Sequence, residues 1–208
     1  AKLKQAVNDI VLSKAFDNGM ICASEQAAIV DKELYDEFVK TMKSHRVHFV
    51  NKKEKAKLEN LLFGVEANSE NCAGAKLNSV IVGKPATEIA KLAGFEVPKG
   101  TVILAAECSE VGVKEPLTRE KLSPILAVIK SSSTKDGIEK ARQMVEFNGL
   151  GHTAAIHTQN EEVAEEFGKV VRACRVVWNS PSTFGGIGDV YNAFIPSLTL
   201  GCGSYGRN

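Results

Sequence analysis

Short apolar segments alternate with amphipathic helical segments along most of this 208-residue chain. The alternation constrains the fold because strand–helix–strand repeats predict parallel strands joined by crossover helices. Strands that are buried on both faces read as continuous apolar runs, as residues 125–129 do. We therefore predict an α/β fold, with an open, mostly parallel sheet in a three-layer α/β/α arrangement. The expected strands cover residues 26–30, 80–82, 101–105, 125–129, 153–158 and 175–178.

The expected helices carry the usual start signals. Asp31 and Asn160 stand at N-cap positions, and Pro85 stands at the first turn of a short helix. Helices are predicted over residues 2–15, 32–44, 52–63 and 85–92, with two more beginning near residues 133–134 and 160. The first helix is expected to turn one face inward, and that face carries Leu3, Val7, Ile10, Val11 and Lys14.

Charge and cysteine content exclude several classes of protein. The 26 Lys and Arg residues balance 25 Asp and Glu residues, so neither a nucleic acid nor an anionic membrane is an implied partner. Five cysteines without a CxxC pair predict neither a disulfide framework nor a metal site, and favour reduced thiols in the cytoplasm. We find no membrane-length apolar run, internal repeat or linker, and therefore expect residues 1–208 to form one domain.

Cys22 is the first candidate for chemistry. It follows the turn residues Asp17, Asn18 and Gly19 and precedes an expected buried strand. A tight connection can present a thiol and direct backbone N–H groups at an oxyanion. The alternative is a small buried core residue, which is common for a free cysteine.

His152 is the second candidate because it follows Gly151 at an expected helix-to-strand turn. The other histidines suit structural positions: His157 lies on an expected strand, and His45 and His48 lie in a basic, solvated segment. The glycine-rich tail, with GGIGD and GCGS, could approach a ligand closely. It does not fit a dinucleotide fingerprint, and a surface loop is the alternative.

Several motifs together resemble the aldehyde dehydrogenase superfamily. The segment FDNGMICASEQAAIVDKELYDEFV resembles its catalytic-cysteine region, and EKLSP resembles its Glu-x-(Phe/Leu)-(Gly/Ser)-Pro motif. The segments ICASEQ, GLGHTAA, GGIGD and SLTLGCGS resemble more narrowly the CoA-acylating branch of this superfamily. This branch includes the aldehyde dehydrogenase part of bifunctional aldehyde-alcohol dehydrogenases of fermenting bacteria. The resemblance spans nearly the whole chain.

This resemblance implies a role for each of several residues. Cys22 would attack acetaldehyde, or acetyl-CoA in the reverse direction, and carry the acyl group as a thioester. Glu120 would help to hold the ribose of NAD, and His152 would serve proton transfer or the handling of coenzyme A. Gly201 and Gly203 would lie near the nicotinamide.

The resemblance also implies features that lie outside residues 1–208. In this family the NAD-binding Rossmann domain and the oxyanion-hole asparagine precede the cysteine-bearing domain. An iron-dependent alcohol dehydrogenase domain can follow it, and the full-length protein is expected to be a homo-oligomer. We therefore expect these residues to fold as the catalytic domain but to have little activity alone.

Two other functions remain open from the residues themselves. A Cys22–His152 pair could serve an NAD-independent acyltransferase, which would transfer acyl groups without forming NADH. The chain could also be a non-enzymatic assembly module of a filament-forming enzyme. Faster alkylation of Cys22 than of the other thiols would favour an enzyme.

Overall fold

A parallel four-stranded sheet organises the larger part of the chain in this computed structural model, which describes residues 2–64, 76–148, 150–189 and 192–198. Within these residues the strand order is β1 (Ala27–Asp31), β4 (Ile125–Ser131), β3 (Ile103–Cys108), β2 (Val47–Phe49). Ala27 pairs with Ala127, and Leu104 pairs with Ile125, so the strands begin close to one edge.

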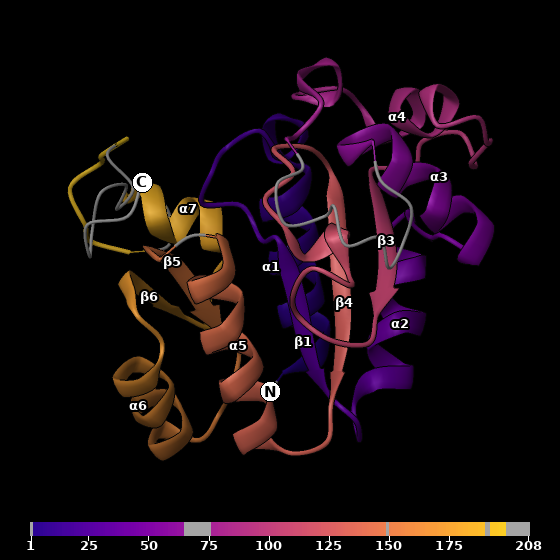
Figure 1. Cartoon of the computed structure of the whole chain (residues 1–208). Coiled ribbons are helices and arrows are strands. Elements are labelled where there is room, and N and C mark those ends of the chain that lie inside the picture. The colour runs from indigo at the N-terminus through magenta and orange to yellow at the C-terminus, as the bar shows by residue number, and fades with distance from the viewer. Residues whose placement is uncertain (1, 65–75, 149, 190–191, 199–208) are drawn as a thin grey trace.

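Helices cover both faces of this sheet and complete the predicted three-layer arrangement (Figure 1). One face packs against α1 (Leu3–Ala15) and α2 (Tyr35–Ser44), through Val7, Phe38 and Met42. The other face packs against α3 (Lys52–Phe63) and α4 (Ala86–Leu92). Because β3 and β4 are buried on both sides, they are apolar along almost their whole length.

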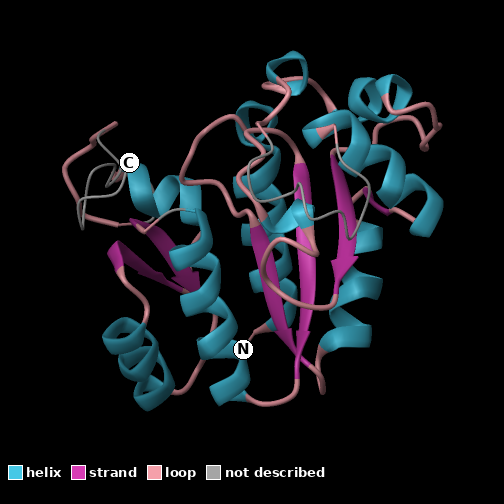
Figure 2. Ribbon diagram, viewed as in Figure 1, coloured by secondary structure: helices cyan, strands magenta, loops and turns pink. Residues whose placement is uncertain are grey.

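A second, two-stranded parallel sheet pairs β5 (Gly151–Ile156) with β6 (Ala173–Trp178) (Figure 2). Its helices are α5 (Thr134–Asn148), α6 (Glu161–Val170) and the short α7 (Ser182–Ile187). Helix α5 contacts β1, β4 and β5, so it bridges the two sheets. Among the described strands, β1 and β5 have no strand partner on the edges that face each other.

Local signals explain where several helices begin and end. Asn51 accepts hydrogen bonds from the N–H groups of Lys53 and Glu54, and Glu54 bonds back to Asn51 in a capping box. Gly64 ends this helix in the left-handed conformation. Asn160 caps α6 as predicted, through Glu162 and Val163.

The predicted strand over residues 80–82 is wrong. Residues Ser79–Ile81 form a 3-10 turn, because the Asn78 side chain caps it by accepting from Val80 N–H. The predicted capping of a helix by Asp31 is also wrong. Asp31 still belongs to β1, its carboxylate accepts from Glu33 N–H, and the helix begins later, at Tyr35.

Two elements were not predicted. The segment assigned to a solvated face contains β2, in which Val47 is buried and His48 is half-buried beside Glu54. The glycine-rich GGIGD segment begins inside α7 and is not a surface loop, since Gly185 and Gly186 are buried. None of the described helices is both long and apolar enough to cross a membrane.

Candidate active site

Parallel pairing brings the candidate residues to one edge of the structure. Cys22 precedes β1, Glu120 precedes β4, and His152 is the second residue of β5. All three side chains line one cavity of about 880 Å³ between the two sheets. Cys22 is partly exposed, and its role together with Glu120 and His152 stays a prediction.

The turn before Cys22 has an uncommon backbone. Asp17, Asn18 and Gly19 all have positive φ angles, of 48°, 50° and 68°. Glycine is required at the third position, because a Cβ there would lie 2.5 Å from the carbonyl oxygen of Ser123. The turn of the cysteine segment therefore packs directly on the EKLSP segment.

Lys121 fixes the EKLSP segment to the cysteine loop. Its side chain is fully buried, and its ammonium donates to the carbonyl oxygens of Gln26 (3.0 Å), Leu117 (2.8 Å) and Arg119 (2.6 Å). Three acceptors match the three N–H bonds of an ammonium group. Lys121 N–H also donates to Gln26 Oε1 at 3.1 Å, so the neighbouring Glu120 is held beside the loop that carries Cys22.

The cavity is largely apolar. Ala27, Ile29, Ile138 and Ala155 are among the residues that line it, and no described lining residue is lysine or arginine. Such a lining suits a short acyl or aldehyde group. Phosphate groups, by contrast, would be expected to bind outside it.

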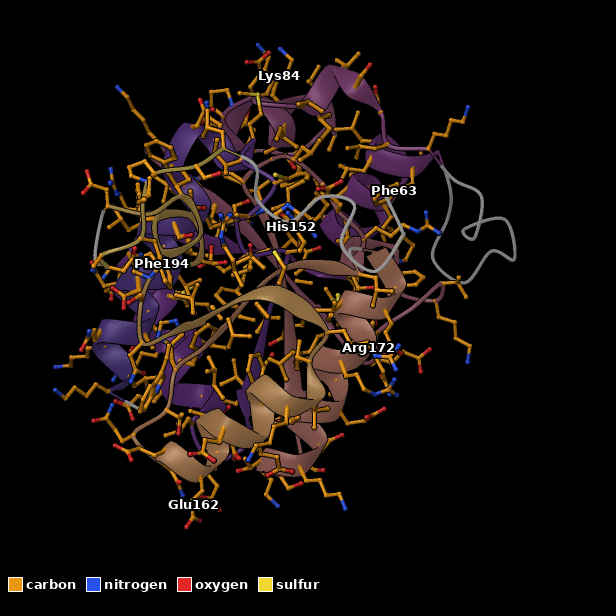
Figure 3. The ribbon with its side chains drawn as sticks, turned by 90° about the vertical axis from the view of Figure 1, so that its left-hand side faces the viewer. Phe63, Lys84, His152, Glu162, Arg172 and Phe194 are labelled. Atoms are coloured by element: carbon orange, nitrogen blue, oxygen red, sulfur yellow. The ribbon has the colours of Figure 1, made fainter. Side chains whose placement is uncertain are left out.

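His152 lies near the middle of the molecule in Figure 3, whereas Glu162 lies at the lower rim. The Nδ1 of His152 is 3.2 Å from Thr153 Oγ1, and the buried Nε2 of His152 has no hydrogen-bond partner among the described residues. Burial lowers the pKa of His152, and the charge of Arg175 lowers it further. A neutral imidazole with an unpaired nitrogen can accept a proton.

A buried group of charges behind Cys22 was not predicted. Lys14 is fully buried, and its Nζ lies 3.3 Å from Ser24 Oγ. Glu25 lines the cavity, and its Oε1 accepts from Ser182 N–H at 3.0 Å. The available signal was Lys14 itself, since a lysine stands on the apolar face of the first helix.

The other candidate residues differ in their surroundings. Gly201 and Gly203 fall outside the described residues. His157 follows β5 and also lines the cavity, and burial lowers its pKa to about 4. Cys174 is exposed on β6, while Cys108 is buried in β3, where burial raises the pKa of its thiol to about 12. No group of three or more His, Cys, Asp or Glu residues that could hold a metal ion occurs among the described residues.

Comparisons with known proteins identify the family of this chain. Residues 1–189 match the model of the aldehyde dehydrogenase family. The chain is 74% identical over its whole length to the aldehyde-alcohol dehydrogenase of Streptococcus pneumoniae, of which it covers 24%. It is 40% identical to the bifunctional aldehyde-alcohol dehydrogenase of Escherichia coli, of which it covers 23%.

A solved structure is similar over the same length. The acetylating aldehyde dehydrogenase from Geobacillus thermoglucosidasius matches all of this chain with a TM-score of 0.90 and 41% identity, and the chain covers 44% of it. The chain thus spans about a quarter of the length of these curated relatives and less than half of the solved one. The match over almost all residues shows that this chain belongs to the aldehyde dehydrogenase family.

Proposed function

We propose that residues 1–208 form the cysteine-bearing catalytic domain of a CoA-acylating acetaldehyde dehydrogenase. The observation that supports this proposal is that Cys22, Glu120 and His152, from three separate segments, line the same cavity. Similarity to acetylating and bifunctional relatives supports the reaction class. The NAD-independent acyltransferase gains no support from these relatives, since they are dehydrogenases.

The reaction would begin at the sulfur of Cys22. Its thiolate adds to the carbonyl carbon of the aldehyde and gives a hemithioacetal. Bound NAD would supply the hydride acceptor for oxidation at this carbon. The acyl group is then held as a thioester on Cys22, and the thiol of coenzyme A takes it up. Thioester exchange is nearly isoenergetic, so the same residues serve the reverse reaction.

His152 would act as the general base and general acid in the acyl transfer. Burial lowers the pKa of its imidazole, which favours the neutral form, and its buried Nε2 has no hydrogen-bond partner among the described residues. Nε2 would accept the proton of the incoming thiol, which makes that thiol a better nucleophile. In the reverse direction the imidazolium would return the proton to the departing thiol.

Glu120 would contact the cofactor. Its carboxyl lines the cavity, and Lys121 holds its backbone in place. Burial raises the pKa of Glu120, and Lys121 and Lys14 oppose this shift. A carboxylate is a suitable acceptor for the hydroxyl groups of a ribose, which fits NAD. Gly201 and Gly203 stay predictions for the nicotinamide end.

The same proposal includes the metabolic role, the location and the further domains of the full-length enzyme. We infer a fermentative role in the cytoplasm, with NAD and coenzyme A bound partly by a Rossmann domain outside residues 1–208. A homo-oligomeric full-length protein with an attached alcohol dehydrogenase domain would fit the bifunctional relatives. A function confined to assembly would leave the shared cavity without a role.

The test is steady-state turnover of the full-length protein with acetaldehyde, NAD and coenzyme A. Cys22→Ser should lower NADH formation by about a thousandfold or more, since the nucleophile is lost. His152→Asn should lower the CoA-dependent rate by roughly a hundredfold. The exposed thiol supplies a matched control, because Cys174→Ser should keep wild-type turnover. Substantial NADH formation by the Cys22 variant would contradict the proposal.

A further inference from the structure

Lys14 occupies a position that packing alone would give to an apolar residue. It lies at the end of α1, its side chain is fully buried, and it faces the interior with Val7 and Ile10. Its Nζ donates to Ser24 Oγ, and this hydroxyl donates in turn to the carbonyl oxygen of Gly19 at 3.2 Å. The ammonium therefore lies against the turn of residues 19–24, which carries Cys22.

The same turn is closed by its own backbone. Ser24 N–H donates to the carbonyl oxygen of Ile21 at 2.9 Å, so residues 21–24 fold back with Cys22 between them. The hydrogen bond from Lys14 reaches the turn at Ser24, two residues beyond the nucleophile. A buried cation that binds the turn next to a thiol favours the thiolate form of that thiol.

Acidic groups partly balance this cation. Glu25 and Glu120 both act electrostatically on Lys14, and Lys121 is a second buried cation beside Glu120. Burial lowers the pKa of Lys14 to about 8, and the two carboxylates oppose that shift. Lys14 is therefore still mostly charged at neutral pH.

Glu25 is held in place by a hydrogen bond from α7. Helix α7 donates to Glu25 Oε1 through Ser182 N–H, and Ser182 Oγ donates to the carbonyl oxygen of Ala23 at 2.8 Å. Thr183 N–H donates to Ser13 Oγ at 2.9 Å, beside Lys14 on α1. The second oxygen of Glu25, Oε2, is buried without a hydrogen-bond partner among the described residues. Burial raises the pKa of Glu25 to about 7.

Stability does not account for this arrangement. Removing an ammonium from water is costly, and well-packed apolar side chains often replace buried ion pairs at no loss of stability. Lys14 and Glu25 also make fewer hydrogen bonds than their atoms allow, as the unpaired Oε2 shows. Their contacts next to the turn that carries the nucleophile offer a functional reason for burying them.

We propose that Lys14 and Glu25 are positioning residues that set the electrostatic potential at Cys22, with Lys14 favouring the thiolate and Glu25 opposing it. Two opposite charges next to the turn that carries the nucleophile would allow the thiolate to form without an excess positive charge in the interior. The proposal rests on the proposed function only in taking Cys22 as the nucleophile. Neither residue need touch the substrate.

The test is the pH dependence of alkylation of Cys22 by iodoacetamide in the full-length protein, followed by peptide mass spectrometry. Lys14→Met should raise the midpoint of the pH–rate curve by about one unit, and lower the rate at pH 7 about five- to tenfold. Lys14→Arg keeps the charge and should restore most of the rate. Glu25→Gln should move the midpoint in the opposite direction, to lower pH.

Two controls separate electrostatics from damage to the fold. Lys4→Met removes an exposed lysine from the same helix and should leave the Cys22 curve unchanged. The exposed Cys174, labelled in the same molecules, should keep its wild-type curve in every variant. A purely structural role would change thermal stability but would not give shifts of opposite sign.

The proposal is wrong if folded Lys14→Met and Glu25→Gln both keep the wild-type midpoint, or if both move it in the same direction. Should Lys14→Met fail to fold, Glu25→Gln alone tests the proposal. A midpoint of the Cys22 alkylation curve that stays or rises in Glu25→Gln would overturn it. Overturning this proposal would leave the proposed function intact, since loss of turnover in Cys22→Ser is measured separately. A Cys22 variant that turns over normally would reject both.

Discussion

Single buried charges determine much of how this molecule should respond to pH. Glu59 is fully buried in α3, and neither of its carboxylate oxygens has a hydrogen-bond partner among the described residues. Nearby, Lys55 forms an ion pair with Glu115 and donates to the carbonyl oxygen of Glu107 at 2.8 Å. Burial raises the pKa of Glu59 to about 7, and Lys55 opposes this shift.

Glu59→Gln should therefore stabilise the protein at alkaline pH. A carboxyl whose pKa is raised on folding contributes stability that is present below its unfolded pKa, 4.5, and is lost as the pH rises through 7. We expect the variant to equal the wild type near pH 4 and to exceed it by about 1–3 kcal/mol at pH 8. Urea unfolding at several pH values measures this difference.

The exposed Glu96 provides the control, since Glu96→Gln should change stability by less than about 0.5 kcal/mol at every pH. A Glu59→Gln difference that is the same at pH 4 and pH 8 would show that the carboxyl does not titrate over this range in the folded protein.

Among the elements, the sequence predicts the strongly patterned ones best. The apolar run at Ile125 and the Asn160 cap each identify an element correctly, because both signals are local. The strand at Val47 is short and polar in part, and it exists because it pairs with β3. Its presence depends on a distant segment, which a local pattern does not record.

The candidate site likewise combines residues that local motifs identify with residues that depend on distant contacts. Cys22, Glu120 and His152 were found because their motifs are contiguous in the sequence. Lys14 was placed on the inward face of the first helix, but its contact with Ser24 was not predicted. Glu25 and Lys121 were not recognised, because their contacts join segments about a hundred or more residues apart, such as Ser182 with Glu25 and Lys121 with Gln26.

Lys121→Met tests how strongly one side chain holds the loop before β4. The change leaves three carbonyl oxygens without their donor, so we expect stability to fall by about 2 kcal/mol and the KM for NAD to rise in the full-length protein. Urea unfolding and initial rates measure the two effects. The exposed Lys114 is the matched control, and Lys114→Met should change neither.

Unchanged stability in Lys121→Met would mean that the cost of burying the ammonium offsets its three hydrogen bonds. An unchanged KM together with lower stability would separate Lys121 from the positioning of Glu120.

At the scale of the whole molecule, the gap between the two sheets is the main feature. The facing edges of β1 and β5 have no strand partner among the described residues, and the cavity between them is about 880 Å³. Helix α5 bridges the gap on one side, and α7 contacts both α1 and β5. A parallel sheet was predicted, but its division into two parts was not, because local patterns do not fix strand order.

An apolar cavity of this size should bind an anilinonaphthalene sulfonate dye when residues 1–208 are expressed alone. Ala155→Phe places a ring in the cavity wall and should remove most of the dye fluorescence. Ala56→Phe, at an exposed position on α3, is the control and should retain it. Equal fluorescence in both variants would indicate that the dye binds elsewhere.

The contacts of Ser182 and Thr183 have a consequence for biosynthesis. They attach the last described helix to Ser13 and Glu25, so the surroundings of Cys22 are complete only when the chain has grown past these positions. Until these contacts form during translation, the sulfur would lack the environment that we propose for it. A nucleophile that acquires its reactivity only after folding is protected from metabolites that would modify it prematurely.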